Sequence, residues 1–216
     1  MEITVFDRII LLLTGIVALY LVYSFYNEYK TYKTEKSYNL WYIASFAVLF
    51  VAGLLIALFG FGVLSLAFIK IVATIIPFGI ALGLVREFYP KYNRYYLIFL
   101  ILGFILILIA SIGAFQTKMV YPVFHAIAGL TIFLLPVWVA RAKLAPAKFI
   151  WVGVGGALIG IGGIALASLG FGKPLLGIFT EEVVFTILTP ILLLMSLSFA
   201  WGFQEDIKIK KSAFYE

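Results

Sequence analysis

Seven long apolar stretches, each of about 18 to 22 residues, dominate this chain of 216 residues. A helix rises about 1.5 Å per residue, so each stretch can cross about 30 Å of hydrocarbon. The stretches are continuously apolar rather than alternating, which favours helices over the strands of a membrane β-barrel. We predict an all-α integral membrane protein with seven transmembrane helices. The predicted helices are Ile9–Tyr26, Leu40–Phe59, Leu64–Val85, Tyr95–Phe115, Pro122–Ala140, Phe149–Leu169 and Val183–Phe203.

The composition agrees with an integral membrane protein. Apolar residues make up 64% of the chain and charged residues 12%, with a mean hydropathy of +1.14, which is too apolar for one water-soluble core. The absence of cysteine excludes disulfides and cysteine-ligated zinc or iron–sulfur sites. The scarcity of Asn, Gln and Cys is compatible with a thermophilic source. The first apolar stretch lacks a signal-peptide cleavage site and is expected to remain as a helix.

Basic residues in the predicted loops indicate the orientation. Cytoplasmic loops carry an excess of Lys and Arg, so we predict an outside N-terminus and a cytoplasmic C-terminus in a cell membrane. Because the net charge of +6 is spread over short loops, we expect anionic lipid headgroups and no nucleic acid as partners. The predicted cytoplasmic side holds twelve basic residues, namely Lys30, Lys33, Lys36, Arg86, Lys91, Arg94, Arg141, Lys143, Lys148, Lys208, Lys210 and Lys211. The other side holds Arg8, Lys118 and Lys173.

An internal repeat is visible at an offset of about 110 residues. Eighteen residues separate Trp41 from the Gly-Phe-Gly at 60–62, and the same spacing separates Trp151 from the Gly-Phe-Gly at 170–172. We predict a 3+1+3 arrangement of parallel three-helix units within a single membrane domain, residues 1–216. The first unit covers residues 1–90, a connector helix covers 95–115 and the second unit covers 121–205. Chance similarity between apolar helices is the alternative.

Small residues and prolines suggest how the helices pack. A stripe of glycines at steps of three and four in the sixth span predicts a close helix contact within the chain, with a dimer seam or a flexible gate as alternatives. Three prolines within or near the ends of spans predict kinks. The glycines are Gly153, Gly156, Gly160 and Gly163, and the prolines are Pro77, Pro136 and Pro190.

Ionisable side chains inside the predicted spans mark a candidate pocket. Lys70 is the clearest case, since an intramembrane charge costs at least about 2.5 kcal/mol in lipid. Alignment of the repeats brings Glu182 to nearly the same depth, which predicts a Lys70–Glu182 ion pair. An outward-facing ligand or ion pocket would consist of Lys70, His125, Glu182, Glu181, Asp7, Thr74 and Thr186. Alternatively, Lys70 reaches the outer headgroups and the two glutamates cap the last helix.

Recognisable catalytic and cofactor motifs are missing from the sequence. It has no Gly-x-Ser-x-Gly, no P-loop, no dinucleotide-binding glycine pattern and no His-Glu-x-x-His. We therefore expect no catalytic residues, no metal site and no cofactor, and an enzyme is the less favoured interpretation.

The 3+1+3 layout resembles that of SWEET-type sugar carriers, and seven helices with an outside N-terminus resemble microbial rhodopsins. Both resemblances concern architecture alone. The Pro-Gln dipeptide typical of the carriers is absent, and Val183–Phe203 lacks the lysine that would bind retinal. Neither resemblance therefore assigns a role to a residue of this chain.

Three functions are compatible with the sequence. The first is a small-solute carrier or binding protein with its pocket open to the outside. The second is a seven-helix sensor that detects an outside ligand and acts through a separate cytoplasmic protein. The third is a structural subunit of a membrane complex. We favour the carrier because duplicated bundles with a polar site are a common carrier plan.

Overall fold

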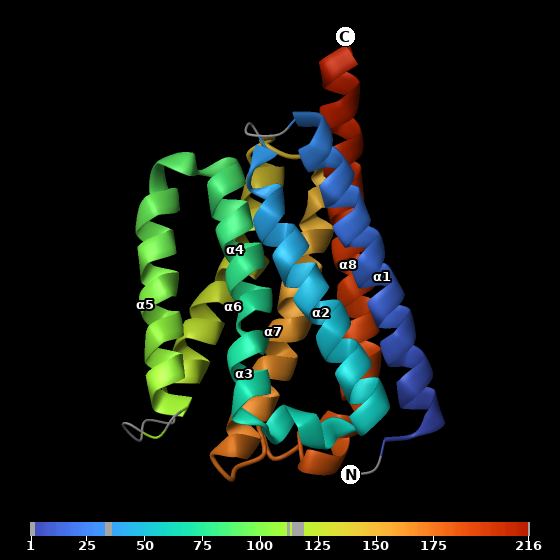
Figure 1. The fold of residues 1–216 in the computed structure, drawn as a ribbon, viewed down its shortest axis with the longest axis vertical. Helices are drawn as coiled ribbons and strands as arrows, with labels where there is room; N and C mark the ends of the chain where they lie inside the picture. Colours follow the sequence, from blue (N-terminus) through green and yellow to red (C-terminus); the bar gives the residue numbers. More distant parts are fainter. Residues whose placement is uncertain (1–2, 33–35, 112, 114–118, 216) are drawn as a thin grey trace.

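The computed structural model describes residues 3–32, 36–111, 113 and 119–215, without the side chains of residues 70, 167, 170 and 213–215. It is nearly all helical, and within the described residues seven segments are long and apolar enough to cross a membrane (Figure 1). The prediction of an all-α, multi-pass membrane protein is confirmed.

The helices follow the predicted spans but differ at their ends. Because hydropathy marks the bilayer and not the helix, the first and last helices continue past the predicted bounds into polar sequence. The fourth ends at Ser111, and the predicted end at Phe115 lies outside the described residues. The elements are α1 Val5–Tyr32, α2 Asn39–Phe59, η2 Phe61–Ser65, α3 Ala67–Ala73, α4 Ile75–Phe88, η3 Pro90–Tyr92, α5 Asn93–Ser111, α6 Val120–Arg141, η4 Ala147–Phe149, α7 Ile150–Gly170 and α8 Glu181–Tyr215.

Six helical segments form a closed ring. Around it, α1 packs on α2, α2 on α4, α4 on α6, α6 on α7, α7 on α8, and α8 again on α1. Helix α5 lies outside the ring against α3, α4 and α6, as the left edge of Figure 1 shows. In this ring α4 and α8 occupy opposite positions.

The two ends of the bundle differ in charge. The α1–α2, α4–α5 and α6–α7 connections and the C-terminus lie together at the top of Figure 1, and the N-terminus lies at the bottom. We call the upper end, which carries Lys36, Arg86, Arg141 and Lys148, the basic end, and the lower one the N-terminal end. Helix α8 has 35 residues and is therefore about 52 Å long, so it extends beyond its neighbours at the basic end.

The third span is interrupted. Helices α3 and α4 meet at Thr74, which keeps right-handed helical dihedrals but whose N–H bonds to the carbonyl of Ile71, three residues earlier; Pro77 follows three residues later. Proline has no N–H to donate to the carbonyl four residues earlier, and its ring crowds that carbonyl. The predicted kink site at Pro77 thus coincides with a helix break, whereas α6 and α8 continue as helices through Pro136 and Pro190.

A close contact between α2 and α4 depends on two glycines four residues apart. A Cβ atom at Gly79 would collide with the hydroxyl of Ser45, and one at Gly83 would collide with the ring of Tyr42. Small residues at this spacing let two helix backbones approach each other closely. Tyr42 can therefore lie flat against α4.

Aromatic rings fill the inside of the ring towards the basic end. Phe203 of α8 is central, with its ring centroid 4.8 Å from that of Tyr42 and 5.1 Å from that of Phe25. We call the whole group the aromatic plug, and all of its side chains are at most 1% exposed. Its members are Phe25, Tyr42, Phe46, Phe149, Phe199 and Phe203.

Candidate functional site

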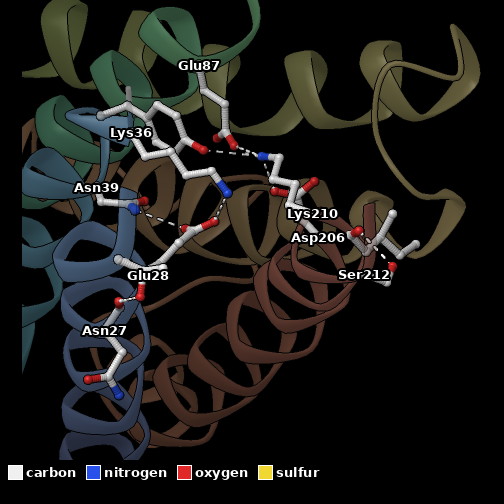
Figure 2. A network of polar contacts seen from close by, with 11 residues as sticks. Asn27, Glu28, Lys36, Asn39, Glu87, Asp206, Lys210 and Ser212 are labelled. Carbon is white, nitrogen blue, oxygen red and sulfur yellow. Dashed lines mark hydrogen bonds and ion pairs between the residues drawn. The ribbon is translucent and has the colours of Figure 1, made fainter. Parts of the chain in front are cut away.

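Figure 2 shows a group of charged and polar side chains that includes the buried Glu28, Asn39 and Asp206. This group lies next to the aromatic plug, towards the basic end. Helical spacing explains its position. On α1, α2 and α8, a residue of this group is three positions from a residue of the plug: Glu28 from Phe25, Asn39 from Tyr42, and Asp206 from Phe203. Residues three apart lie on the same helix face. We call the group the buried network; it consists of Glu28, Lys36, Asn39, Tyr42, Glu87, Asp206 and Lys210.

The first part of the buried network surrounds Glu28, which is 1% exposed. Lys36 Nζ lies 2.6 Å from Glu28 Oε1, and Asn39 Nδ2 donates to Oε2 at 2.9 Å. The same ammonium lies 3.9 Å from the centroid of the Tyr32 ring. Both oxygens of this buried carboxylate therefore have donors, and one is a full positive charge.

The second part joins opposite sides of the ring. Lys210 of α8 contacts both Asp206, one turn earlier on α8, and Glu87 of α4. The hydroxyl of Tyr42 donates to the other oxygen of Glu87 at 2.6 Å. The side chain of Glu87 is 5% exposed and that of Asp206 is 6% exposed. An ion pair between α4 and α8 thus crosses the inside of the ring at the basic end.

The electrostatics of this region are unusual because acidic residues lie near helix C-termini. Glu28 is in the last turns of α1 and Glu87 is next to the last residue of α4, where the helix dipole disfavours negative charge. Desolvation by burial, followed by the negative charge of Glu87, raises the pKa of Tyr38 well above its usual range. Tyr38 therefore remains a neutral hydroxyl, 3.5 Å from Lys210 Nζ.

Among the residues that the structure describes, no group of three or more His, Asp or Glu side chains is arranged to hold a metal ion. Glu28 and Glu87 are each occupied by donors from lysine, asparagine or tyrosine. The described contacts of these carboxylates hold α1, α2, α4 and α8 together.

Among the predicted pocket residues whose side chains the structure describes, Asp7 has a hydrogen-bond partner on another helix. Its Oδ1 accepts from the hydroxyl of Thr189 on α8 at 2.7 Å, and its Oδ2 accepts from the backbone N–H and the hydroxyl of Thr4. Asp7 is 8% exposed and Thr189 is fully buried. These contacts join α1 to α8 near the N-terminal end.

The predicted pocket residues on α8 lie on its exposed face. Glu181, Glu182 and Thr186 are exposed, and the Thr186 hydroxyl donates to the carbonyl of Glu182 in its own helix. The side chain of Lys70 lies outside the described part of the structure. Helix α3, which carries Lys70, packs on α2, α4 and α5, whereas α8 packs on α1 and α7. The Lys70–Glu182 pair stays a prediction.

The remaining two predicted pocket residues lie inside the bundle. Thr74 is fully buried at the α3–α4 break, where its hydroxyl donates to the carbonyl of Ile71 at 2.6 Å. His125 of α6 stacks on Tyr121, with ring centroids 5.4 Å apart, and lies beside Gly163 of α7. Its Nδ1 is buried and has no hydrogen-bond partner among the described residues.

The glycine stripe of α7 faces α6 for most of its length. A Cβ at Gly153 or Gly156 would lie 2.8 Å from backbone atoms of α6, and one at Gly163 would lie 3.2 Å from His125 Nε2. Around Gly160 there is open space. The positions of the stripe therefore differ strongly in whether they can accept a side chain larger than that of glycine.

The sequence prediction missed the buried network because it searched for charges within the apolar spans. The three acidic residues of the network lie at the ends of spans, among many basic residues: Glu28, Glu87 and Asp206. The sequence prediction treated these span ends as loops and counted only their basic residues. A usable signal was present, since an acidic residue at a helix C-terminus opposes the helix dipole and requires a positive partner.

Comparison of the chain with protein families, with curated proteins and with solved structures found no match. The geometry of the bundle and of the buried network therefore carries the functional argument.

Proposed function

We propose that this protein is a small-solute carrier whose basic end is closed in this conformation. The observation that carries the proposal is the ion pair between Lys210 of α8 and Glu87 of α4, two opposite helices of the ring. It lies next to the aromatic plug, so a polar contact and an apolar barrier close the same end. A carrier needs such a barrier on one side of its site at a time.

The ring divides into two groups of three spans. One group is α1, α2 and α3–α4, the other is α6, α7 and α8, and α5 connects them from outside. We propose that these groups are the two parallel repeats and that they rock against each other. The Lys210–Glu87 pair joins one group to the other, so breaking it would free the basic end.

The solute site belongs, in this proposal, to the half of the bundle between the plug and the N-terminal end. The break at Thr74 supports this location, because interrupted helices in carriers expose backbone groups to a solute. His125 offers a buried nitrogen without a described partner, and Asp7 and Thr189 supply a polar contact. Lys70, Glu181, Glu182 and Thr186 would form the entrance.

The orientation and the lipid partner belong to the same proposal. We place the basic end in the cytoplasm of a cell, facing anionic headgroups, because Lys and Arg gather there. The solute would then enter from outside, and the closed buried network would prevent leakage into the cytoplasm.

Reconstitution into proteoliposomes tests this function. Uptake is measured for a panel of labelled sugars, amino acids, carboxylates and nucleosides, with thermal shifts of the solubilised protein as an independent measure of binding. We expect at least one class to be taken up, and we expect the double variant Glu87→Gln/Lys210→Met to alter that uptake. The pair of the exposed Lys148 and the half-buried Glu205 lies outside the buried network and provides the control Lys148→Met/Glu205→Gln. Absence of uptake and of thermal shifts across the panel would contradict the carrier.

A sensor is the second candidate, and the length of α8 favours it. The helix continues from Phe203 to Tyr215 past the basic end, which offers a surface to a cytoplasmic protein. Affinity capture with the solubilised protein distinguishes the two. A stoichiometric partner that is lost when residues 211–216 are deleted, together with no solute uptake, would favour the sensor.

A further inference from the structure

The charges of the buried network are unbalanced. Lys36 pairs with Glu28. Among the described residues, Lys210 is then the one positive charge in contact with Glu87 and Asp206. If both carboxylates were ionised, one buried negative charge would lack a partner, and an unpaired buried charge costs several kcal/mol. One further positive charge is required at this position.

Hydrogen bonding indicates which of the two carboxylates binds a proton that supplies this charge. Both oxygens of Glu87 accept bonds, one from Tyr42 and one from Lys210, which an ionised carboxylate does best. Asp206 receives one described bond, on Oδ2 from Lys210. Asp206 therefore has an oxygen available for a proton, whereas both oxygens of Glu87 are occupied.

A second observation concerns hydrogen-bond donors among the described residues of the network. Asn39 is fully buried and its amide faces the network (Figure 2). Its Nδ2 donates to Glu28, but its Oδ1 accepts nothing from the described residues. Among the described residues, the network thus lacks a positive charge at Asp206 and a hydrogen-bond donor at Asn39 Oδ1.

The surroundings of Asp206 are dominated by negative and neutral groups. Glu87 comes from α4, Tyr42 from α2, Tyr38 from the turn before α2, and Glu28, already paired, from α1. On α8 itself, Lys210 is the positive neighbour, while Glu205 points to the exposed Lys148. Two like charges that share one ammonium cannot both remain ionised at low cost.

We propose that Asp206 is a proton-binding site. When the basic end closes, an O–H bond forms at the free oxygen of Asp206 as an O–H bond of a hydronium ion breaks, and the proton leaves by the reverse step when the end opens. No electrons are transferred. Given the carrier function proposed above, proton binding favours the closed basic end and proton loss favours the open one, so the rate of solute movement depends on pH.

Infrared spectroscopy of the solubilised protein tests proton binding without any solute. A protonated carboxylic acid gives a carbonyl stretching band that a carboxylate lacks and that shifts in heavy water. We expect this band at neutral pH in the parent, its loss at alkaline pH, and its absence in Asp206→Asn. The neighbouring Glu205→Gln, which removes a carboxylate paired with Lys148 and Lys208, should retain the band. A band that persists in Asp206→Asn, or no band in the parent, would overturn the site.

A metal cation could supply the missing charge instead, and the same samples distinguish it. If sodium or potassium ions balance Asp206, the parent would lack the band and its thermal stability would depend on that ion. We expect stability in choline, sodium and potassium chloride at equal ionic strength to agree. A specific increase in one of the two metal salts would overturn the proton assignment.

Proteoliposomes buffered at the same pH inside and outside test the effect on transport. For a solute taken up by the parent, we expect a higher initial rate at alkaline pH than at neutral pH, because Asp206 is then deprotonated. Asp206→Asn should lose this pH dependence, and Glu205→Gln should keep it. Uptake in the parent that does not depend on pH would refute the effect on transport while the infrared result stands, and absence of any uptake would refute the carrier instead.

Discussion

The charged residues of the buried network depend on one another, because the carboxylates among them are removed from water. Lys210 is the most connected of them, with contacts to Glu87, Asp206 and Tyr38. Its side chain is 27% exposed, while the carboxylates that it serves are nearly buried. Loss of the ammonium would leave Glu87 with the hydroxyl of Tyr42 alone.

Lys210→Met should therefore destabilise the protein strongly. Removal of one partner of a buried ion pair costs about 3 kcal/mol, since the remaining charge stays buried. The free energy of unfolding of the solubilised protein measures the effect. Lys148→Met is the control, because Lys148 is 57% exposed and should change stability by less than about 0.5 kcal/mol.

The double variant Glu87→Gln/Lys210→Met should recover most of this loss, because no buried charge is left without its partner at Glu87. Buried ion pairs can often be replaced by neutral groups without a large penalty. If the double variant were as unstable as Lys210→Met, packing of the lysine stem rather than its charge would explain the loss.

At the scale of helices, contacts near the N-terminal end join α1 to α8. Thr189 donates to Asp7, whereas Thr186, one turn earlier on α8, bonds only within its own helix among the described residues. Thr189→Val should lower the free energy of unfolding by about 2 kcal/mol, as expected for a lost hydrogen bond to a charged group. Thr186→Val should lower it by less than about 0.5 kcal/mol. Equal effects of the two variants would contradict the α1–α8 contact.

The packing of α7 on α6 makes a second prediction at this scale. A Cβ at Gly156 would meet backbone atoms of Ile132 and Phe133, whereas Gly160 has open space around it. Gly156→Ala should destabilise the protein by about 1 to 3 kcal/mol through overpacking. Gly160→Ala should be neutral or stabilise by about 0.5 kcal/mol, because alanine is the better helix former. Thermal unfolding of both variants in one detergent would check this order.

For the whole molecule, much of the architecture could be predicted from hydropathy. Seven spans follow from continuous apolar stretches, since lipid leaves the backbone no other partners. The long extension of α8 could not be read in this way, because its continuation beyond Phe203 is polar and its stability comes from contacts such as Lys210 with Glu87. The buried network combines α1, α2, α4 and α8, and hydropathy does not reveal which helices become neighbours.

Opening of the basic end is the central claim, and a distance measurement between spin labels tests it most directly. The chain has no cysteine, so labels can be attached at Tyr92→Cys and Lys211→Cys, two exposed positions on opposite sides of that end. In reconstituted protein, we predict one predominant distance in the parent. A second, longer population should appear after Glu87→Gln/Lys210→Met and not after Lys148→Met/Glu205→Gln. An unchanged distribution in both double variants would contradict a gate at the basic end.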